Sequence, residues 1–257
     1  MSLVISYNEL QKAVGRYLGC GRNVYGPDNG TVEWADIEDC IKSGLRQFYS
    51  PPIAAGMQQL HHWSFLEPTA TLSLVSGRQD YDMPVDFGGI KGNMTYEPSE
   101  ANYPIVVVGE TQIRKLRQNR GDETDNPKFV GIRPKSIDGS VSQRFEAVFW
   151  PKPNAANNIS YRYYVIPAMI TNDLPYPYGG AVHSETILES CLAIAEQRLN
   201  DSKGLHWDKF MERLAASIQY DLKTSCPDYF GYNGDNSDSS THIDRTDEVT
   251  YNGNSID

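Results

Sequence analysis

Histidines that adjoin another reactive side chain are the first candidates for chemistry in this sequence. His61 is followed by His62, and His183 is followed by Ser184. Adjacent histidines point in different directions on a helix, and neither an HxxxH or HExxH spacing nor a neighbouring carboxylate completes a metal set. No GxSxG motif surrounds the serine, and a serine at a helix start usually caps it. We expect one of the paired histidines to be exposed, the other to pack on the aromatic residues that follow, and Ser184 to be a helix cap.

Carboxylates are the second group of candidates, because most glycosidases use a pair of them. Glu185 and Glu189 are four residues apart, and we expect both to face solvent opposite the apolar stripe of a helix. Glu196 lies among apolar residues near Arg198, which favours a structural ion pair. The glycines in 88–92 open no helix and lack a GK[ST] ending, so they predict no phosphate site. The sequence therefore predicts no catalytic residue, no metal site and no cofactor, and a polysaccharide hydrolase that uses these glutamates stays open as an alternative.

One local cluster of positive charge interrupts an acidic chain. Arg114, Lys115, Arg117 and Arg120 lie close together, whereas the whole chain has a formal net charge of −10. This balance argues against a nucleic-acid-binding regulator, but it suits a surface that DNA passes without sticking. Two interpretations of the cluster stay open: a solvated helix face, or a contact with phosphates or an acidic neighbour.

The composition is that of a globular protein. Hydrophobic residues make up 39% and aromatic residues 11% of 257 residues, and 16 of these are tyrosines. Tyrosine suits half-buried strands and also interfaces, so a carbohydrate-binding module is a further alternative. Cys20, Cys40, Cys191 and Cys226 show no CxxC spacing, and we expect Cys40 and Cys191 to be reduced and buried. The sequence also shows no signal peptide and no apolar run long enough to span a membrane.

The elements that would position these groups begin with an amphipathic helix in the stretch 34–66. Acidic residues occupy its first turn, where the helix dipole favours negative charge, and Pro51 and Pro52 end it. A short helix over 53–62 is expected to follow. The apolar stripe that predicts the first helix consists of Ile37, Cys40, Ile41, Gly44, Leu45 and Phe48.

Further helices are predicted at both ends of the chain. The first covers 6–19, with Ser6 as its N-cap. A second begins at Ser184, with a stripe of Ile187, Leu188, Cys191, Leu192, Ala195 and Leu199. A third covers 202–222, with a stripe of Leu205, Phe210, Met211, Leu214, Ile218 and Leu222. The N-terminal and C-terminal helices therefore need each other to bury their apolar faces.

Between these helices the period of the sequence changes to that of short strands. Strands are predicted at 70–75, 80–83, 90–96, 104–108, 128–133, 145–150 and 159–166, with a small basic helix at 111–119. This spacing favours an antiparallel sandwich or small barrel. The fold class is therefore α+β, a helical bundle with an inserted β domain. The expected divisions are 1–66 and 167–225 for the bundle, 67–166 for the β domain and 226–257 for an extended tail.

Several short motifs, and the order in which they occur along the chain, resemble those of phage head–tail adaptor (connector) proteins. They are the runs 36–38, 44–52, 62–66, 81–89, 145–151 with Pro153, 161–164 and 183–196 with Asn200 and Asp201. The resemblance covers roughly 34–222. It implies a helical bundle with an inserted β domain, and a ring, commonly of twelve copies, that binds the portal protein and attaches a tail or nozzle protein. Such a ring encloses the channel for DNA during ejection and is not an enzyme.

The resemblance also assigns expected partners and contacts. The protein would be a structural protein of the virion at the head–tail junction, made in the host cytoplasm. Its tail would reach the portal through Tyr229, Phe230 and Tyr232, because aromatic residues carry much interface energy. Arg114, Lys115 and Arg117 would contact a neighbouring subunit or partner. Another neck or tail-completion protein is the nearest alternative.

Overall fold

The computed structural model describes residues 3–19, 32–53, 60–98, 103–135, 143–225, 250–251 and 254–255. The chain divides into two compact units, Met1–Lys223 and Thr224–Asp257. The first unit combines helices with antiparallel and mixed sheets, so the predicted α+β class is confirmed. The expectations for Tyr229, Phe230, Tyr232, Cys20 and Cys226 lie outside the described residues.

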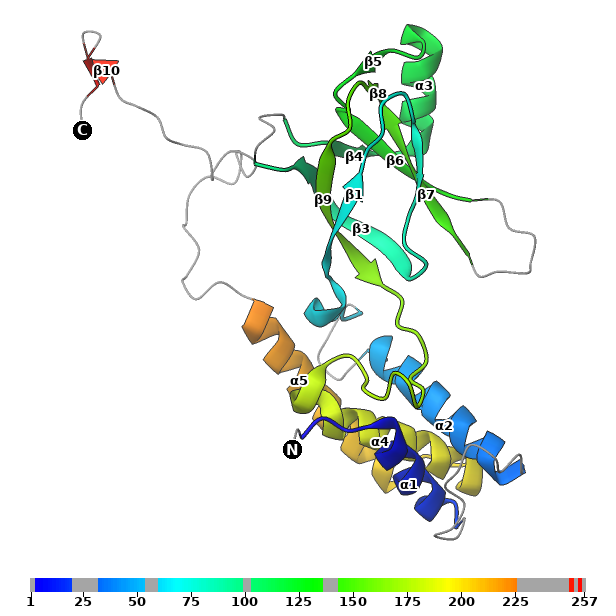
Figure 1. The fold of residues 1–257 in the computed structure, drawn as a ribbon. Coiled ribbons are helices and arrows are strands. Elements are labelled where there is room, and N and C mark those ends of the chain that lie inside the picture. The colour runs from blue at the N-terminus through cyan, green and yellow to red at the C-terminus, as the bar shows by residue number, and fades with distance from the viewer. Residues whose placement is uncertain are drawn as a thin grey trace. The chain divides into compact units, whose positions relative to one another are not determined.

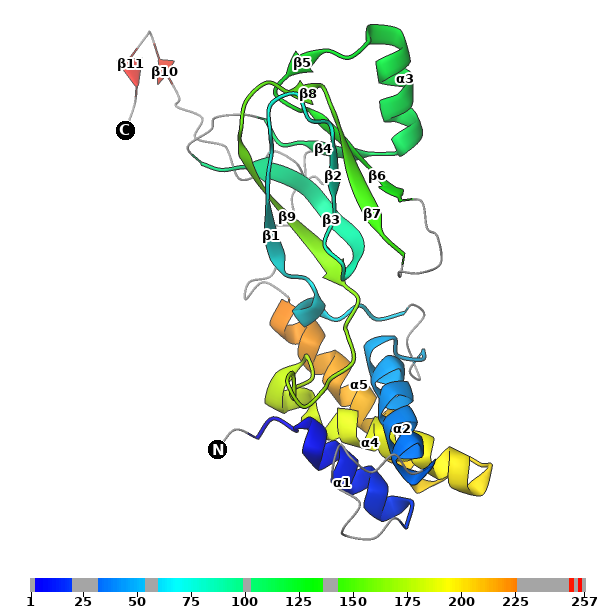
Figure 2. The ribbon, with the colours of Figure 1, turned by 45° about the vertical axis from the view of Figure 1, so that its right-hand side comes forward.

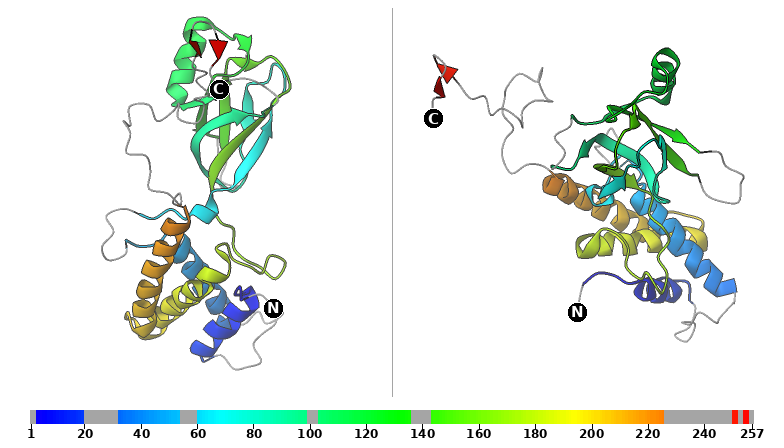
Figure 3. Two further views of the ribbon diagram at one scale, coloured as in Figure 1. Left: turned by 90° about the vertical axis from the view of Figure 1, so that its left-hand side faces the viewer. Right: turned by 45° about the horizontal axis from the view of Figure 1, so that its top comes forward.

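Four helices of the first unit share one hydrophobic core (Figure 1). They are α1 (Tyr7–Tyr17), α2 (Val32–Tyr49), α4 (Gly180–Asn200) and α5 (Leu205–Ser225). In both panels of Figure 3, α4 lies between α1 and α5. All six stripe residues predicted for α2 are buried. Segments from the two ends of the chain therefore build one apolar core, as their periodicity requires.

The start of α1 agrees with the sequence in detail. Ser6 is its N-cap, and its side chain accepts a hydrogen bond from the backbone N–H of Glu9. The Glu9 carboxylate in turn accepts a hydrogen bond from the backbone N–H of Ser6, which completes a capping box. This reciprocal pair satisfies backbone donors that the helix itself leaves free.

The strands form two main sheets (Figure 2). One has the order β1-β9-β3 and the other the order β2-β7-β6-β4. Both contribute to one core, in which Phe87, Ile159 and Tyr161 meet Tyr81, Val130 and Phe149. The strands are β1 (Thr69–Ser73), β2 (Asp80–Asp82), β3 (Phe87–Tyr96), β4 (Val106–Val108), β6 (Phe129–Pro134), β7 (Phe145–Trp150) and β9 (Asn158–Val165).

The expectation of purely antiparallel pairing is wrong at two places. β4 pairs with β6 in parallel, and β5 (Thr124–Asp125) pairs in parallel with β8 (Lys152–Pro153). Parallel strands need a crossover connection, and the basic helix α3 (Glu110–Arg120) supplies it between β4 and β6. The sequence located this helix at 111–119 but did not indicate that it joins parallel strands.

The start of α4 also differs from the prediction. Gly179 is the N-cap, and Gly179 and Gly180 have positive φ angles of 107° and 66°. Ser184 lies one turn inside the helix, where its hydroxyl donates to the carbonyl oxygen of Gly180 at 2.9 Å and accepts from the N–H of Ile5 at 3.0 Å. The hydroxyl therefore fastens the chain before α1 to α4, a role that it could not have as a cap.

The ends of the predicted stripes are wrong for a common reason. Leu199, Leu205 and Leu222 are exposed by 56%, 63% and 44%. They lie in the outermost turns of α4 and α5. Of the short helix expected over 53–62, residues 54–59 lie outside the described residues, and 60–63 are not helical. A short 3-10 helix, η1 (Ser64–Leu66), follows and leads to β1.

Beyond the last residues of α5, the structure describes the second unit only at two short strands. β10 (Thr250–Tyr251) pairs antiparallel with β11 (Asn254–Ser255). Across the ranges that the structure describes, no helix is long and apolar enough to cross a bilayer.

Candidate functional site

The predicted basic cluster lies on α3. Ile113 anchors this helix, because its side chain is buried with Val148 and Trp150 of β7. Arg114 and Lys115 are exposed, whereas the guanidinium group of Arg120 lies over the ring of Trp150 at 5.9 Å from its centroid. The structure therefore brings Arg114, Lys115 and Arg117 to one helix that projects from β6 and β7 (Figure 2).

Nearby acids balance most of this positive charge. Arg114 binds Glu110 at 2.8 Å, and Arg117 binds Asp122 at 3.3 Å. In residues 110–125, four basic residues face four acidic ones, so the formal charge sums to zero. Lys115 forms no ion pair with any described residue. This mixed surface fits a protein neighbour with charges of both signs better than it fits a row of phosphates.

The expectation that the paired histidines have no carboxylate partner is wrong for His61. Its Nε2 atom lies 2.9 Å from Oδ2 of Asp221, and both side chains are almost completely buried. The ring of His61 also packs edge-on against Trp63 at 4.8 Å between centroids. His62 is exposed beside the ring of Tyr164, at 5.2 Å between centroids. The expected split into one packed and one exposed histidine is thus confirmed.

The segment around His61 is held from several sides. Trp63 Nε1 donates to the carbonyl oxygen of Phe48 at 2.9 Å, which ties the segment to the end of α2. Asp221 accepts hydrogen bonds from Ser64 N at 3.1 Å and Ser64 Oγ at 2.6 Å. The sequence could not reveal Asp221 as the partner, because 160 positions separate it from His61.

His183 is buried in an aromatic cluster rather than paired with Ser184 as a nucleophile. Its ring lies 5.1 Å from Trp63 and 5.2 Å from Phe65 between centroids. Its Nδ1 atom has no hydrogen-bond partner among the described residues. Burial lowers the pKa of His183 because a charged ring would lose its hydration, whereas the nearby carboxylate of Asp221 opposes this shift.

The three glutamates have separate structural positions. Glu185 is exposed as expected, but Glu189 is buried and lies 2.7 Å from Nδ1 of His206. Glu196 is also buried and accepts hydrogen bonds from the N–H groups of His206 at 2.9 Å and Trp207 at 3.4 Å. These donors belong to the first turn of α5, so Glu196 caps α5 from the neighbouring helix instead of pairing with Arg198. Both buried carboxylates hold the turn between α4 and α5.

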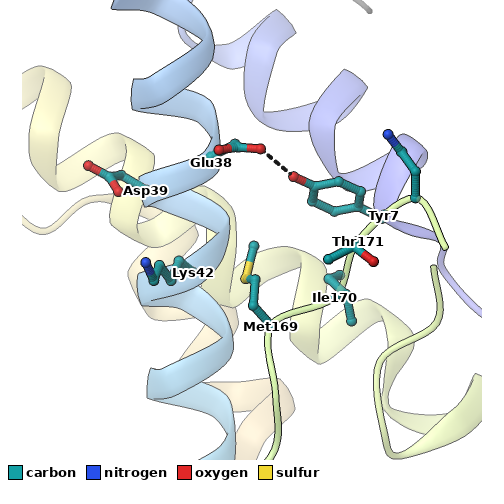
Figure 4. A pocket seen from close by; sticks show the side chains of 8 residues that line it. Tyr7, Glu38, Asp39, Lys42, Met169, Ile170 and Thr171 are labelled. Atoms are coloured by element: carbon teal, nitrogen blue, oxygen red, sulfur yellow. Dashed lines mark hydrogen bonds between the residues drawn. The ribbon is translucent and has the colours of Figure 1, made fainter. Parts of the chain in front are cut away.

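A pocket of about 210 Å³ opens between α1, α2 and the connector that precedes α4. Figure 4 shows Glu38 and Asp39 on one side and Met169 and Ile170 on another. The hydroxyl of Tyr7 donates to Glu38 at 2.9 Å, and burial together with this carboxylate raises the pKa of Tyr7 to about 12. This hydrogen bond joins α1 to α2, so Tyr7 and Glu38 have a structural role at the pocket.

A second pocket, of about 240 Å³, lies between the end of α2, the segment that leads to β1 and the end of β9. Its walls are mainly apolar and aromatic, and they include Tyr49, Trp63, Leu66 and Tyr164. His62 is its one ionisable imidazole. Among the residues that the structure describes, no three His, Cys, Asp or Glu side chains are arranged to hold a metal ion.

The two cysteines within the described residues are free and fully buried, as expected. Burial raises the pKa of both Cys40 and Cys191, because the apolar surroundings disfavour a thiolate. They act as small core residues where α2 meets α4.

The connector before α4 carries an exposed apolar surface that sequence reasoning did not assign to a site. Leu174, Tyr176 and Tyr178 are exposed by 68%, 61% and 48%. The connector is nevertheless held in place: the N–H of Tyr7 donates to the carbonyl oxygen of Pro175 at 2.7 Å, and Tyr49 Oη donates to the carbonyl oxygen of Tyr178 at 3.5 Å. Apolar side chains displayed by a fastened loop are typical of an interaction surface. The Pro/Tyr-rich composition of 167–180 was the signal that could have indicated it.

The class of the protein follows from a comparison with known protein families. The model of the SU10 adaptor protein family matches residues 5–228, which include the four-helix core and both main sheets. The chain belongs to this family of phage head–tail adaptors. No curated protein matches the chain.

Proposed function

We propose that twelve copies of this adaptor form a ring that binds the portal protein and joins it to the tail or nozzle. The ring encloses the channel that DNA crosses during ejection. The observation that carries the proposal is the family match, because it extends over the helical core and the β strands alike. The formal charge of −10 also supports a lumen that does not retain DNA.

We propose the following domain boundaries along the chain. Residues 1–66 and 167–225 form one helical bundle, 67–166 an inserted sandwich-like β domain, and 226–257 an extended tail. The shared core of α1, α2, α4 and α5 supports the first part of this division. The separate core to which both main sheets contribute supports the second.

Contacts with other copies or partners would use the surface of α3. Arg114, Lys115 and Arg117 are the proposed residues, and Lys115 is the one whose charge no described acid neutralises. The triple change of these residues to glutamate should leave the far-UV circular dichroism unchanged and weaken assembly. Lys209→Glu is the matched control, since Lys209 is exposed on α5 and forms no ion pair with a described residue. Unchanged assembly of the triple variant would remove α3 from the proposed interface.

Docking on the portal would use the tail, through Tyr229, Phe230 and Tyr232. Aromatic anchors supply a large part of the energy of many interfaces. The triple change of these residues to alanine should weaken binding to purified portal and leave the melting temperature of Met1–Lys223 unchanged. Binding of the wild-type chain to tail tube but not to portal would instead favour another tier of the neck.

A further inference from the structure

Asp221 holds a buried carboxylate near the end of α5. Its side chain is 5% exposed, and it lies one turn before Ser225, the last residue of the helix. Its Oδ1 atom accepts from Ser64 Oγ at 2.6 Å, and its Oδ2 atom accepts from Ser64 N at 3.1 Å and lies 2.9 Å from His61 Nε2. A buried carboxylate needs such partners, because each lost hydrogen bond leaves charge without compensation.

The segment that Asp221 holds is also fastened to the β strands. Glu67, three residues after Ser64, has a side chain that is 4% exposed. Its carboxylate binds Arg162 of β9 at 3.2 Å and forms an ion pair with Lys91 of β3. The segment 61–67 is therefore bound through two buried carboxylates. The carboxylate of Asp221 in α5 binds His61 and Ser64, and the segment's own Glu67 binds the sheet.

We propose that Asp221 couples the C-terminal end of α5 to the sheet β1-β9-β3 through the segment 61–67. The inference rests on the proposed function in one respect: the residues proposed to dock on the portal directly follow α5. A partner that displaces the end of α5 must either break three contacts of a buried carboxylate or move the segment 61–67 with it. Because these three contacts bind the carboxylate to the segment 61–67, we expect a displacement of the end of α5 to reach that segment and, through Glu67, the strands β3 and β9.

Hydrogen exchange of the full chain, with and without purified portal protein, tests the coupling. Asp221→Asn keeps the shape of the side chain and removes its charge. In the free protein, this variant should exchange about tenfold faster in peptides that cover 61–73, since hydrogen bonds to a charged group are stronger than those to a neutral amide. Asp208→Asn, at an exposed acid in the first turn of α5, is the matched control and should leave the exchange of 61–73 unchanged.

Hydrogen exchange in the presence of portal protein distinguishes the proposed coupling from the proposed docking. In the wild-type protein, portal should change the exchange of 61–73 and of peptides from β3 and β9; in Asp221→Asn it should bind without that change. Portal that binds while 61–73 keeps its wild-type exchange overturns the coupling and leaves the proposed function intact. Absence of portal binding contradicts the proposed function. The exchange of Asp221→Asn and Asp208→Asn in the free protein then still tests whether Asp221 holds the segment 61–67.

A second variant keeps the test decisive if Asp221→Asn does not fold. Ser64→Ala removes one donor and retains the carboxylate, so a smaller increase in the exchange of 61–73 is expected. Unchanged exchange in Ser64→Ala, or equal exchange in Asp221→Asn and Asp208→Asn, would contradict the role of Asp221.

Discussion

Ser190 Oγ donates a hydrogen bond of 2.8 Å to the carbonyl oxygen of Gly44, deep in the contact between α4 and α2. The two helices approach closely at this point, because a β-carbon on Gly44 would lie 2.6 Å from the α-carbon of Cys191. The glycine is thus required by space rather than by conformation. Through this contact the N-terminal and C-terminal parts of the chain form one core.

Gly44→Ala should destabilise the protein strongly. The added methyl group meets backbone atoms that cannot rotate away, so we predict a loss of about 2 kcal/mol in the free energy of unfolding. Urea unfolding followed by circular dichroism measures it. Gly109→Ala is the control, because Gly109 has an ordinary φ of −64° and no atom within 4 Å of an added β-carbon. Equal stability of the two variants would show that α2 and α4 are less closely packed.

Glu196→Ala should lower the free energy of unfolding by about 2 kcal/mol, because two N–H groups at the first turn of α5 lose a charged acceptor. Glu185→Ala on the same helix should change it by less than about 0.5 kcal/mol, since Glu185 is exposed. Thermal melts at pH 7 compare the two variants. A larger loss for Glu185→Ala would contradict the capping role of Glu196.

Acid should weaken the fold through His183. Its folded-state pKa is lowered by burial, so the unfolded state binds more protons once the pH falls below the ordinary histidine value of about 6.5. The contribution of neutral His183 to the free energy of unfolding is therefore fully present above about pH 6.5, and it declines as the pH falls from there toward the folded-state pKa. His183→Phe, which keeps a ring in the aromatic cluster, should reduce that decline. Denaturant unfolding at pH 7.5 and pH 5.5 gives the slope, and equal slopes would assign the proton uptake to another group.

Periodicity revealed the parts of the fold that depend on local sequence. The stripe of α2 and the cap at Ser6 are encoded within a few residues, and both are confirmed. The start of α4 was missed because Gly179 and Gly180, with their positive φ angles, set it one turn before Ser184. The parallel pairing of β4 with β6 was missed because strand direction follows from the crossover, not from the strand itself.

The interaction features were harder to predict, since they depend on residues distant in sequence. Asp221 could not be assigned to His61 and Ser64 without the packing of α5 against the segment that leads to β1. The burial of Glu189 likewise depends on His206, which the turn after α4 brings back to it. The position of the basic cluster on a helix was predicted, whereas the ion pairs of Arg114 with Glu110 and of Arg117 with Asp122 needed the folded chain.

The mass and symmetry of the particle formed on mixing this protein with purified portal test the central proposal most directly. Native mass spectrometry and electron microscopy of the mixture would give both. We predict a complex with twelve copies of the adaptor in a ring, and its loss when residues 226–257 are removed. A protein that stays monomeric and shows no affinity for portal would contradict the account.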